Sequence, residues 1–129
     1  MNYALGTTFY VMFTTRAFST GIPATLGGTP VISAYADDNE TQITAGITLT
    51  ADFDSVTGLN NVEVVATSGN GYAVDTDYNL VITTGTVSSV SVVGEVIGTF
   101  RLGNVPSNIA AINGATVTGD GSGTPWDAA

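Results

Sequence analysis

The sequence predicts an all-β protein, built as an antiparallel two-sheet β-sandwich of about seven strands. Threonine, valine, isoleucine and tyrosine, which favour strands, dominate the chain. Sixteen glycines divide it into short runs, and no run shows the apolar spacing of an amphipathic helix. Short strand-forming runs separated by turn residues are typical of a sandwich or barrel.

The chain of 129 residues is long enough for one domain with a core. We expect three parts: an N-terminal arm over residues 1–7, a β-sandwich over residues 8–102, and a Gly-rich C-terminal arm over residues 103–129. Within the last part, residues 105–112 can hold one short strand. Residues 118–125 are rich in glycine and read as a flexible linker.

Six runs within the sandwich are predicted as strands. They are residues 8–14, 30–36, 43–50, 62–67, 78–83 and 87–102. Period-2 alternation predicts which side chains share a face: Phe9 with Val11 and Phe13, Ile43 with Ile47 and Leu49, Tyr78 with Leu80 and Ile82, and Val90 with Val92, Val96 and Phe100. The last run is the longest, and Gly94 and Gly98 within it indicate bulges or close backbone approach.

The connections are predicted from turn residues. An irregular loop over 19–30 contains two prolines and three glycines, and the other turns or loops lie at 37–40, 52–61 and 68–71. We expect Leu59 to be the apolar plug where the chain re-enters the sheet, and Phe53 to be buried between two exposed acids. Arg16 is either a surface ion-pair partner or a partly buried guanidinium that bonds loop carbonyls or an acid.

Charge excludes several classes of partner. Eleven acidic residues against Arg16 and Arg101 give a net charge of −9. Nucleic-acid binding needs clustered basic residues, and an anionic membrane surface would repel this chain. No apolar run is long enough to span a membrane, and the N-terminus lacks the basic and apolar regions of a signal peptide. We therefore expect no nucleic-acid and no membrane partner.

Catalysis and cofactors are not expected. The chain has no cysteine and no histidine, so disulfides, thiolate metal sites and histidine chemistry are excluded. The acid pairs Asp52 with Asp54 and Asp75 with Asp77 are weak candidates for a calcium site, but they do not match the spacing of a known calcium loop. The competing interpretation is that these aspartates form turns.

Two stretches carry a resemblance to a known family. The first is Phe13–Gly21 with Pro23, Thr29-Pro30-Val31 and Tyr35, and the second runs through Thr44–Thr50, Phe53–Asn60, Gly71-Tyr72-Ala73, Asp77-Tyr78, Val81-Ile82 and Val96–Phe100. Over residues 8–102 this set, in this order, resembles the immunoglobulin-like β-sandwich domains on the surface of tailed-bacteriophage virions, such as tail or head fibre N-terminal and attachment domains. The resemblance implies an immunoglobulin-like fold and no catalytic residues.

The resemblance also implies a function and a location. We expect a non-enzymatic virion structural protein, assembled in the host cytoplasm, that is an anchor or adaptor attached to the head, neck or tail at a fibre or spike base. The alternatives are a capsid decoration protein and a glycan-binding module for host adsorption. The expected partners are other virion proteins and further copies of the chain.

Aromatic residues are the candidate contacts with partners. Trp126, Tyr3 and Tyr10 are the candidates for partner binding, and glycan binding would use these three with Tyr72. Trp126 is either a plug on the domain's own surface or an anchor in a neighbouring subunit. We expect both arms to become ordered only against neighbouring proteins. Phe100 is expected to be structural, together with Arg16, Phe53 and Leu59.

Overall fold

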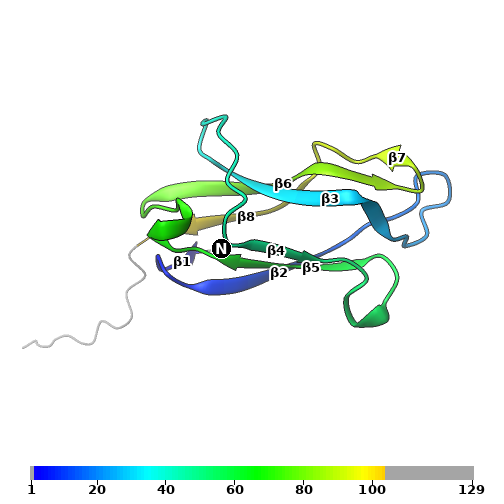
Figure 1. The fold of residues 1–129 in the computed structure, drawn as a ribbon, viewed down its shortest axis with the longest axis horizontal. Helices are drawn as coiled ribbons and strands as arrows, with labels where there is room; N and C mark the ends of the chain where they lie inside the picture. Colours follow the sequence, from blue (N-terminus) through cyan, green and yellow to red (C-terminus); the bar gives the residue numbers. More distant parts are fainter. Residues whose placement is uncertain (1, 104–129) are drawn as a thin grey trace, which may run out of the picture.

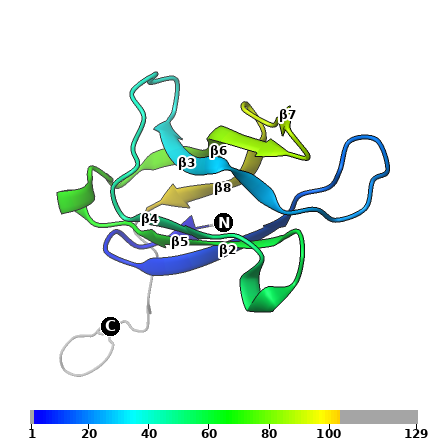
Figure 2. The ribbon, with the colours of Figure 1, turned by 45° about the vertical axis from the view of Figure 1, so that its right-hand side comes forward.

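A computed structural model describes residues 2–103 of the chain as two stacked β-sheets (Figure 1). The strands are β1 (Asn2–Tyr3), β2 (Thr8–Thr14), β3 (Leu26–Ala36), β4 (Ile47–Thr50), β5 (Leu59–Val65), β6 (Thr76–Val87), β7 (Val90–Ser91) and β8 (Val96–Leu102). Two short 3-10 helices, η1 (Phe53–Ser55) and η2 (Ser68–Asn70), lie in the connections. Figure 2 shows the two layers from a second direction.

The strand order defines the sandwich. One sheet has the order β1-β8-β6-β3, with β7 paired to β6, and the other has the order β2-β5-β4. Every pairing is antiparallel except that of β1 with β8, which is parallel. The predicted all-β sandwich is therefore confirmed.

The core lies between the two sheets, and both contribute to it. Its buried apolar residues are Phe9, Leu26, Ile32, Ala34, Val62, Val64, Ala66, Tyr72, Tyr78, Leu80, Ile82, Val87, Phe100 and Leu102. Aromatic rings make contact at one end of this core: Phe9 with Phe100 at 4.8 Å between ring centroids, and Phe100 with Tyr78 at 5.0 Å. Burial of this apolar area is the main favourable term in folding.

Most of the predicted inward faces are confirmed. Tyr78, Leu80 and Ile82 are almost completely buried, and Phe9 and Phe100 are buried as expected. The other predicted inward-facing residues are only partly buried against the core. They are Val11, Phe13, Ile43, Ile47 and Leu49. Alternation was a reliable guide here because each of these strands has one face toward the core and one away from it.

The prediction of one long strand over residues 87–102 is wrong. The chain completes β6 at Val87, turns through Ser88 and Ser89 with φ of 50° and 66°, and returns as β7. A second turn precedes β8, where the Gly94 N–H donates to the Ile82 carbonyl at 2.9 Å. The predicted face also fails, because Val90 and Val96 are exposed.

Other strand boundaries differ from the predicted ones. β3 begins at Leu26, inside the predicted loop over 19–30, and a register shift between Gly27 and Val31 accommodates Pro30. β4 covers only four residues, because Ile43 bridges to Ala34 in the opposite sheet. β5 begins three residues before its predicted start, and β6 is longer than predicted at both ends.

Residues 2–7 are part of the sandwich, and this corrects the expectation of an N-terminal arm that becomes ordered only against neighbours. Asn2 and Tyr3 pair with Arg101 and Leu102 of β8. The Tyr3 ring stacks on Phe9 with 4.0 Å between ring centroids, and the Gly103 N–H donates to the Tyr3 carbonyl at 3.0 Å. The predicted C-terminal arm and its short strand lie outside the described residues from residue 104 onward.

Candidate functional site

Asp75 and Asp77 are paired with Arg101 on the sheet surface. The Arg101 guanidinium lies 3.1 Å from the Asp77 carboxylate and 3.9 Å from that of Asp75. All three side chains are substantially exposed, so each ion pair contributes little to stability. The sequence suggested this acid pair as calcium ligands, whereas the structure gives both carboxylates a cationic partner from β8.

Asp52 and Asp54 have different surroundings. The Asp52 carboxylate accepts from the Gly58 N–H at 2.9 Å and from the Thr25 hydroxyl at 2.8 Å. Asp54 is exposed within η1. Asp52 therefore holds the loop between β4 and β5 against the start of β3. Among residues 2–103, no three acidic, histidine or cysteine side chains are grouped closely enough to hold a metal ion.

Phe53 and Leu59 do not have the positions predicted for them. Phe53 is only partly buried in η1, and Leu59 is the first residue of β5 and is also only partly buried. Asn60, the next residue, occupies the inward position instead and is completely buried. The sequence pattern missed this asparagine because alternation was read from apolar residues alone.

Asn60 ties three segments together. Its side-chain amide donates to the Thr15 hydroxyl at 3.2 Å and to the Gly58 carbonyl at 3.3 Å. Thr15 in turn donates its hydroxyl to the Ala24 carbonyl at 2.7 Å. This buried polar group fixes the strand ends from which the two loops at this end of the sandwich emerge.

Arg16 is a loop residue with an exposed side chain. It forms a β-bridge with Pro23, and its guanidinium donates to the Gly21 carbonyl at 3.1 Å. Of the two roles left open by the sequence, the structure shows the bond to a loop carbonyl, made at the surface. Phe100, the other residue expected to be structural, lies in the core.

The aromatic partner-binding candidates are not brought together. Tyr3 packs on Phe9 and Tyr72 is buried in the core. Tyr10 is exposed on the outer face of β2, and its hydroxyl donates to the Glu63 carboxylate at 3.2 Å. Trp126 lies outside the described residues. These three tyrosines therefore form no common glycan-binding surface.

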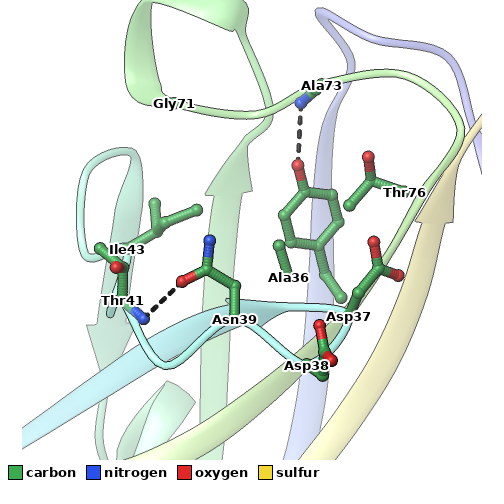
Figure 3. Close-up of a pocket in the computed structure, with 10 residues that line it drawn as sticks. Ala36, Asp37, Asp38, Asn39, Thr41, Ile43, Gly71, Ala73 and Thr76 are labelled. Carbon is green, nitrogen blue, oxygen red and sulfur yellow. Dashed lines mark hydrogen bonds between the residues drawn. The ribbon is translucent and has the colours of Figure 1, made fainter.

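A pocket of about 590 Å³ lies beside the loop that follows β3 (Figure 3). It is lined by Ala36, Asp37, Asp38, Asn39, Thr41, Ile43, Gly71, Ala73, Thr76 and Tyr78. The Asn39 side chain accepts from the Thr41 N–H at 2.9 Å, and the Asp37 carboxylate accepts from the Asp77 N–H at 3.3 Å. These polar groups hold the turns that surround the pocket.

Two buried tyrosines stand beside this pocket. The Tyr78 hydroxyl accepts from the Ala73 N–H at 2.8 Å, which is one of the bonds drawn in Figure 3. The Tyr72 hydroxyl donates to the Ala45 carbonyl at 3.2 Å. Burial, and secondarily the nearby Tyr78, raise the pKa of Tyr72 to about 12. Tyr72 therefore stays protonated at neutral pH, and its hydroxyl connects two loops.

Large apolar side chains are exposed at the opposite end of the sandwich. Phe18 is 90% exposed and Ile22 63% exposed, both in the loop between β2 and β3. Val56 is 47% exposed in the loop between β4 and β5. Figure 1 shows both loops at the same end, on the right. Gly58 packs closely on Pro23 and Ala24, which brings the bases of the two loops together.

The loop that carries Phe18 and Ile22 has a defined shape. The Ala17 N–H donates to the Ile22 carbonyl at 2.8 Å, and the Gly21 N–H donates to the Ala17 carbonyl at 2.8 Å. The loop thus holds its apolar side chains away from the core. The sequence contained a partial signal for this, because Ile22 lies in the loop predicted over 19–30 and Phe18 lies just before it, outside every predicted strand.

No helix among residues 2–103 combines the length and apolar character needed to cross a membrane. Comparison of the chain with protein-family models, with curated proteins and with solved structures gave no match.

Proposed function

We propose that this chain is a non-enzymatic structural protein of a tailed-phage virion, an anchor or adaptor attached to the head, neck or tail. It would assemble in the host cytoplasm and contact other virion proteins through the end of the sandwich that carries Phe18 and Ile22. The resemblance of residues 8–102 to virion-surface domains motivates this role. The exposure of Phe18 is the observation that carries it.

Exposed apolar side chains on rigid loops favour protein contacts. A large apolar side chain that is 90% exposed at the tip of a hydrogen-bonded loop is ready to enter a pocket in another protein. Only 10% of the residues are charged, which lowers the cost of removing water from the surrounding surface.

We further infer that the sandwich is immunoglobulin-like. The sheets β2-β5-β4 and β3-β6-β8 have the strand order of the B-E-D and C-F-G strands of constant-type immunoglobulin domains. Tyr78 lies near the start of β6, and its hydroxyl bonds to the backbone of Ala73 five residues earlier. This corresponds to the tyrosine corner of such domains, and it supports the fold part of the resemblance.

The test compares incorporation of variants into particles. In a phage whose own copy of the gene is deleted, the unmodified chain and a Phe18→Ser/Ile22→Ser variant are supplied from a plasmid. Quantitative mass spectrometry of purified particles should find the unmodified chain and a loss of at least about tenfold for the variant, as expected when a contact of 1.4 kcal/mol or more is removed.

Val74→Ser is the matched control. Val74 is another exposed apolar residue, in the loop before β6 and away from the Phe18 end. Its substitution should leave incorporation unchanged. Equal incorporation of the Phe18→Ser/Ile22→Ser variant and the unmodified chain would contradict the proposed contact surface. Specific adsorption of the purified chain to host glycans, without incorporation into particles, would contradict the structural role.

A further inference from the structure

Along β2, at the border of the smaller sheet, backbone groups have no partner among residues 2–103. β2 pairs with β5 on one side only, and Figure 2 shows it, in blue, along the border of its layer. The Thr7 carbonyl accepts from the Ala66 N–H, and the Thr15 N–H donates to the Gly58 carbonyl. In an antiparallel ladder alternate residues bond to the same neighbour, so the odd-numbered residues of β2 bond to β5.

The even-numbered residues therefore point their N–H and C=O groups away from the sheet. These residues are Thr8, Tyr10, Met12 and Thr14, and their side chains are all exposed. Tyr10 and Met12 are more than half exposed. One strand thus offers a row of free donors and acceptors beside two large apolar side chains, which is the arrangement that accepts an additional strand.

β2 lacks the devices that protect the other borders. Natural edge strands are blocked by charges, prolines, bulges or short length. β4 has only four residues. β3 contains Pro30 and two register shifts, and Ile43 bridges to it. β8 is partly covered by β1. β2 has seven residues with no charge, proline or glycine, and its register with β5 is unbroken.

The sequence of β2 is nearly palindromic, and this identifies the occupant. It reads Thr-Phe-Tyr-Val-Met-Phe-Thr, centred on Val11. When a second copy lies antiparallel with Val11 opposite Val11, Thr8 faces Thr14 and Phe9 faces Phe13. Tyr10 then faces Met12. The outward-facing residues fall opposite one another in this register, so every free N–H and C=O group finds a partner.

We propose that two copies of this chain associate through β2, antiparallel and about a two-fold axis at Val11, to form one continuous six-stranded sheet. Such an interface uses the same patch on both copies. Cross-strand Thr–Thr and aromatic pairs stabilise antiparallel sheets, and the Tyr10–Met12 pairs add sulfur–aromatic contacts. In a chain of net charge −9, an uncharged strand is also where two copies repel each other least.

This inference does not depend on the virion role, because self-association is measured on the purified full chain. Analytical ultracentrifugation should show a dimer that dissociates on dilution. Tyr10→Lys/Met12→Lys places lysines opposite lysines across the axis, and Tyr10→Glu/Met12→Glu does the same with acids. Each variant alone should be monomeric with an unchanged circular dichroism spectrum, and an equimolar mixture of the two should form a heterodimer.

The matched control is Thr48→Lys/Thr50→Lys, which places two lysines on exposed positions of β4 in the same sheet and should remain dimeric. A wild-type chain that stays monomeric at its highest soluble concentration would overturn the proposal. So would lysine or glutamate variants that remain dimeric, or that fail to associate when mixed.

A cysteine cross-link tests the register separately. The chain has no cysteine, and opposed residues of a non-hydrogen-bonded antiparallel pair lie about 4.5 Å apart at Cα, within reach of a disulfide. Val11→Cys should therefore form a covalent dimer under mild oxidation. Met12→Cys would lie diagonally, about 7–8 Å from its copy, and should cross-link poorly. Preferential cross-linking of Met12→Cys would overturn the Val11 axis.

Discussion

Tyr78 joins the core to the corner between β5 and β6. Its ring packs on Phe100 while its hydroxyl accepts from the Ala73 N–H. Tyr78→Phe keeps the ring and removes this bond, so the free energy of unfolding should fall by about 1 kcal/mol. Urea denaturation measures this change.

Tyr35→Phe is the control for Tyr78→Phe. Tyr35 is partly buried in β3, and its hydroxyl makes no hydrogen bond to the described residues, so its removal should change stability by less than about 0.5 kcal/mol. Equal effects of the two substitutions would show that the Tyr78 hydroxyl does not hold the corner.

The raised pKa of Tyr72 predicts how stability depends on alkaline pH. The folded state keeps the phenolic proton up to about pH 12, whereas the unfolded chain loses it near pH 10.0. The contribution of Tyr72 is therefore fully present below pH 10 and is lost as the pH rises toward 12. The free energy of unfolding should fall more steeply with pH in this window for the wild type than for Tyr72→Phe. Parallel curves would contradict the raised pKa.

Single positions also show where sequence reasoning failed. Phe53 and Leu59 were expected inside because they are apolar, but the completely buried residue at this place is Asn60. Its amide N–H groups satisfy carbonyl and hydroxyl groups where two strands end. These bonds offset part of the cost of burying a polar side chain, while its Oδ1 atom has no hydrogen-bond partner among the described residues. The hydrophobicity of a residue does not indicate which buried carbonyl and hydroxyl groups need a hydrogen-bond donor.

At the scale of elements, Asp52 fixes the loop between β4 and β5. Asp52 and Asp54 both have positive φ, at 50° and 56°, so alanine at either position carries a similar backbone cost. Only Asp52 bonds to Gly58 and Thr25. Asp52→Ala should therefore lower the free energy of unfolding by about 1–2 kcal/mol more than Asp54→Ala, as measured by urea denaturation. Equal losses would contradict this role.

Close packing between the same loops makes Gly58 sensitive to substitution. Gly58 and Gly21 both have positive φ, at 81° and 74°, but a Cβ at Gly58 would lie 2.8 Å from atoms of Pro23, Ala24 and Thr15. At Gly21 no atom lies within 4 Å. Gly21→Ala should cost about 1 kcal/mol, and Gly58→Ala about 1–3 kcal/mol more. Thermal and urea unfolding of the two variants provide the comparison, and similar costs would argue against tight loop packing.

Elements were predicted best where one face is buried. The inward faces of β2, β4 and β6 follow from alternation alone. The prediction of one strand over 87–102 failed because Ser88 and Ser89 form a tight turn with positive φ. Serine is a weaker turn signal than glycine or proline, so the turn between the valines was missed. The pairing of Asn2–Tyr3 with β8 joins distant parts of the chain, and two residues are too short for a periodic signal.

For the whole molecule, composition and spacing were sufficient for the fold class but not for the surfaces. Phe18 and Tyr10 lie at exposed places that depend on how the loop after β2 folds and on which strand lies at a sheet border. Neither property is local in sequence. The acid pairs illustrate the same limit, since Arg101 and Thr25, which partner them, are distant in the chain.

The two proposed contacts use different parts of the molecule. The Phe18 end would contact another virion protein, whereas the β2 border would contact a second copy. Their exposed side chains lie on a loop and on a strand respectively, so the Phe18→Ser/Ile22→Ser variant should still dimerise. Loss of dimer in that variant would show that the two surfaces are not independent.

The proposed role makes this chain a structural component of a phage particle. The most direct measurement is quantitative mass spectrometry of particles purified from any tailed phage whose genome is found to carry the gene. We expect the chain to co-purify with intact particles at a small, fixed copy number set by the symmetry of the neck, tail or fibre base. A copy number equal to that of the shell subunits would instead indicate a decoration protein. A chain that is abundant in the lysate and absent from the particles would contradict the virion role.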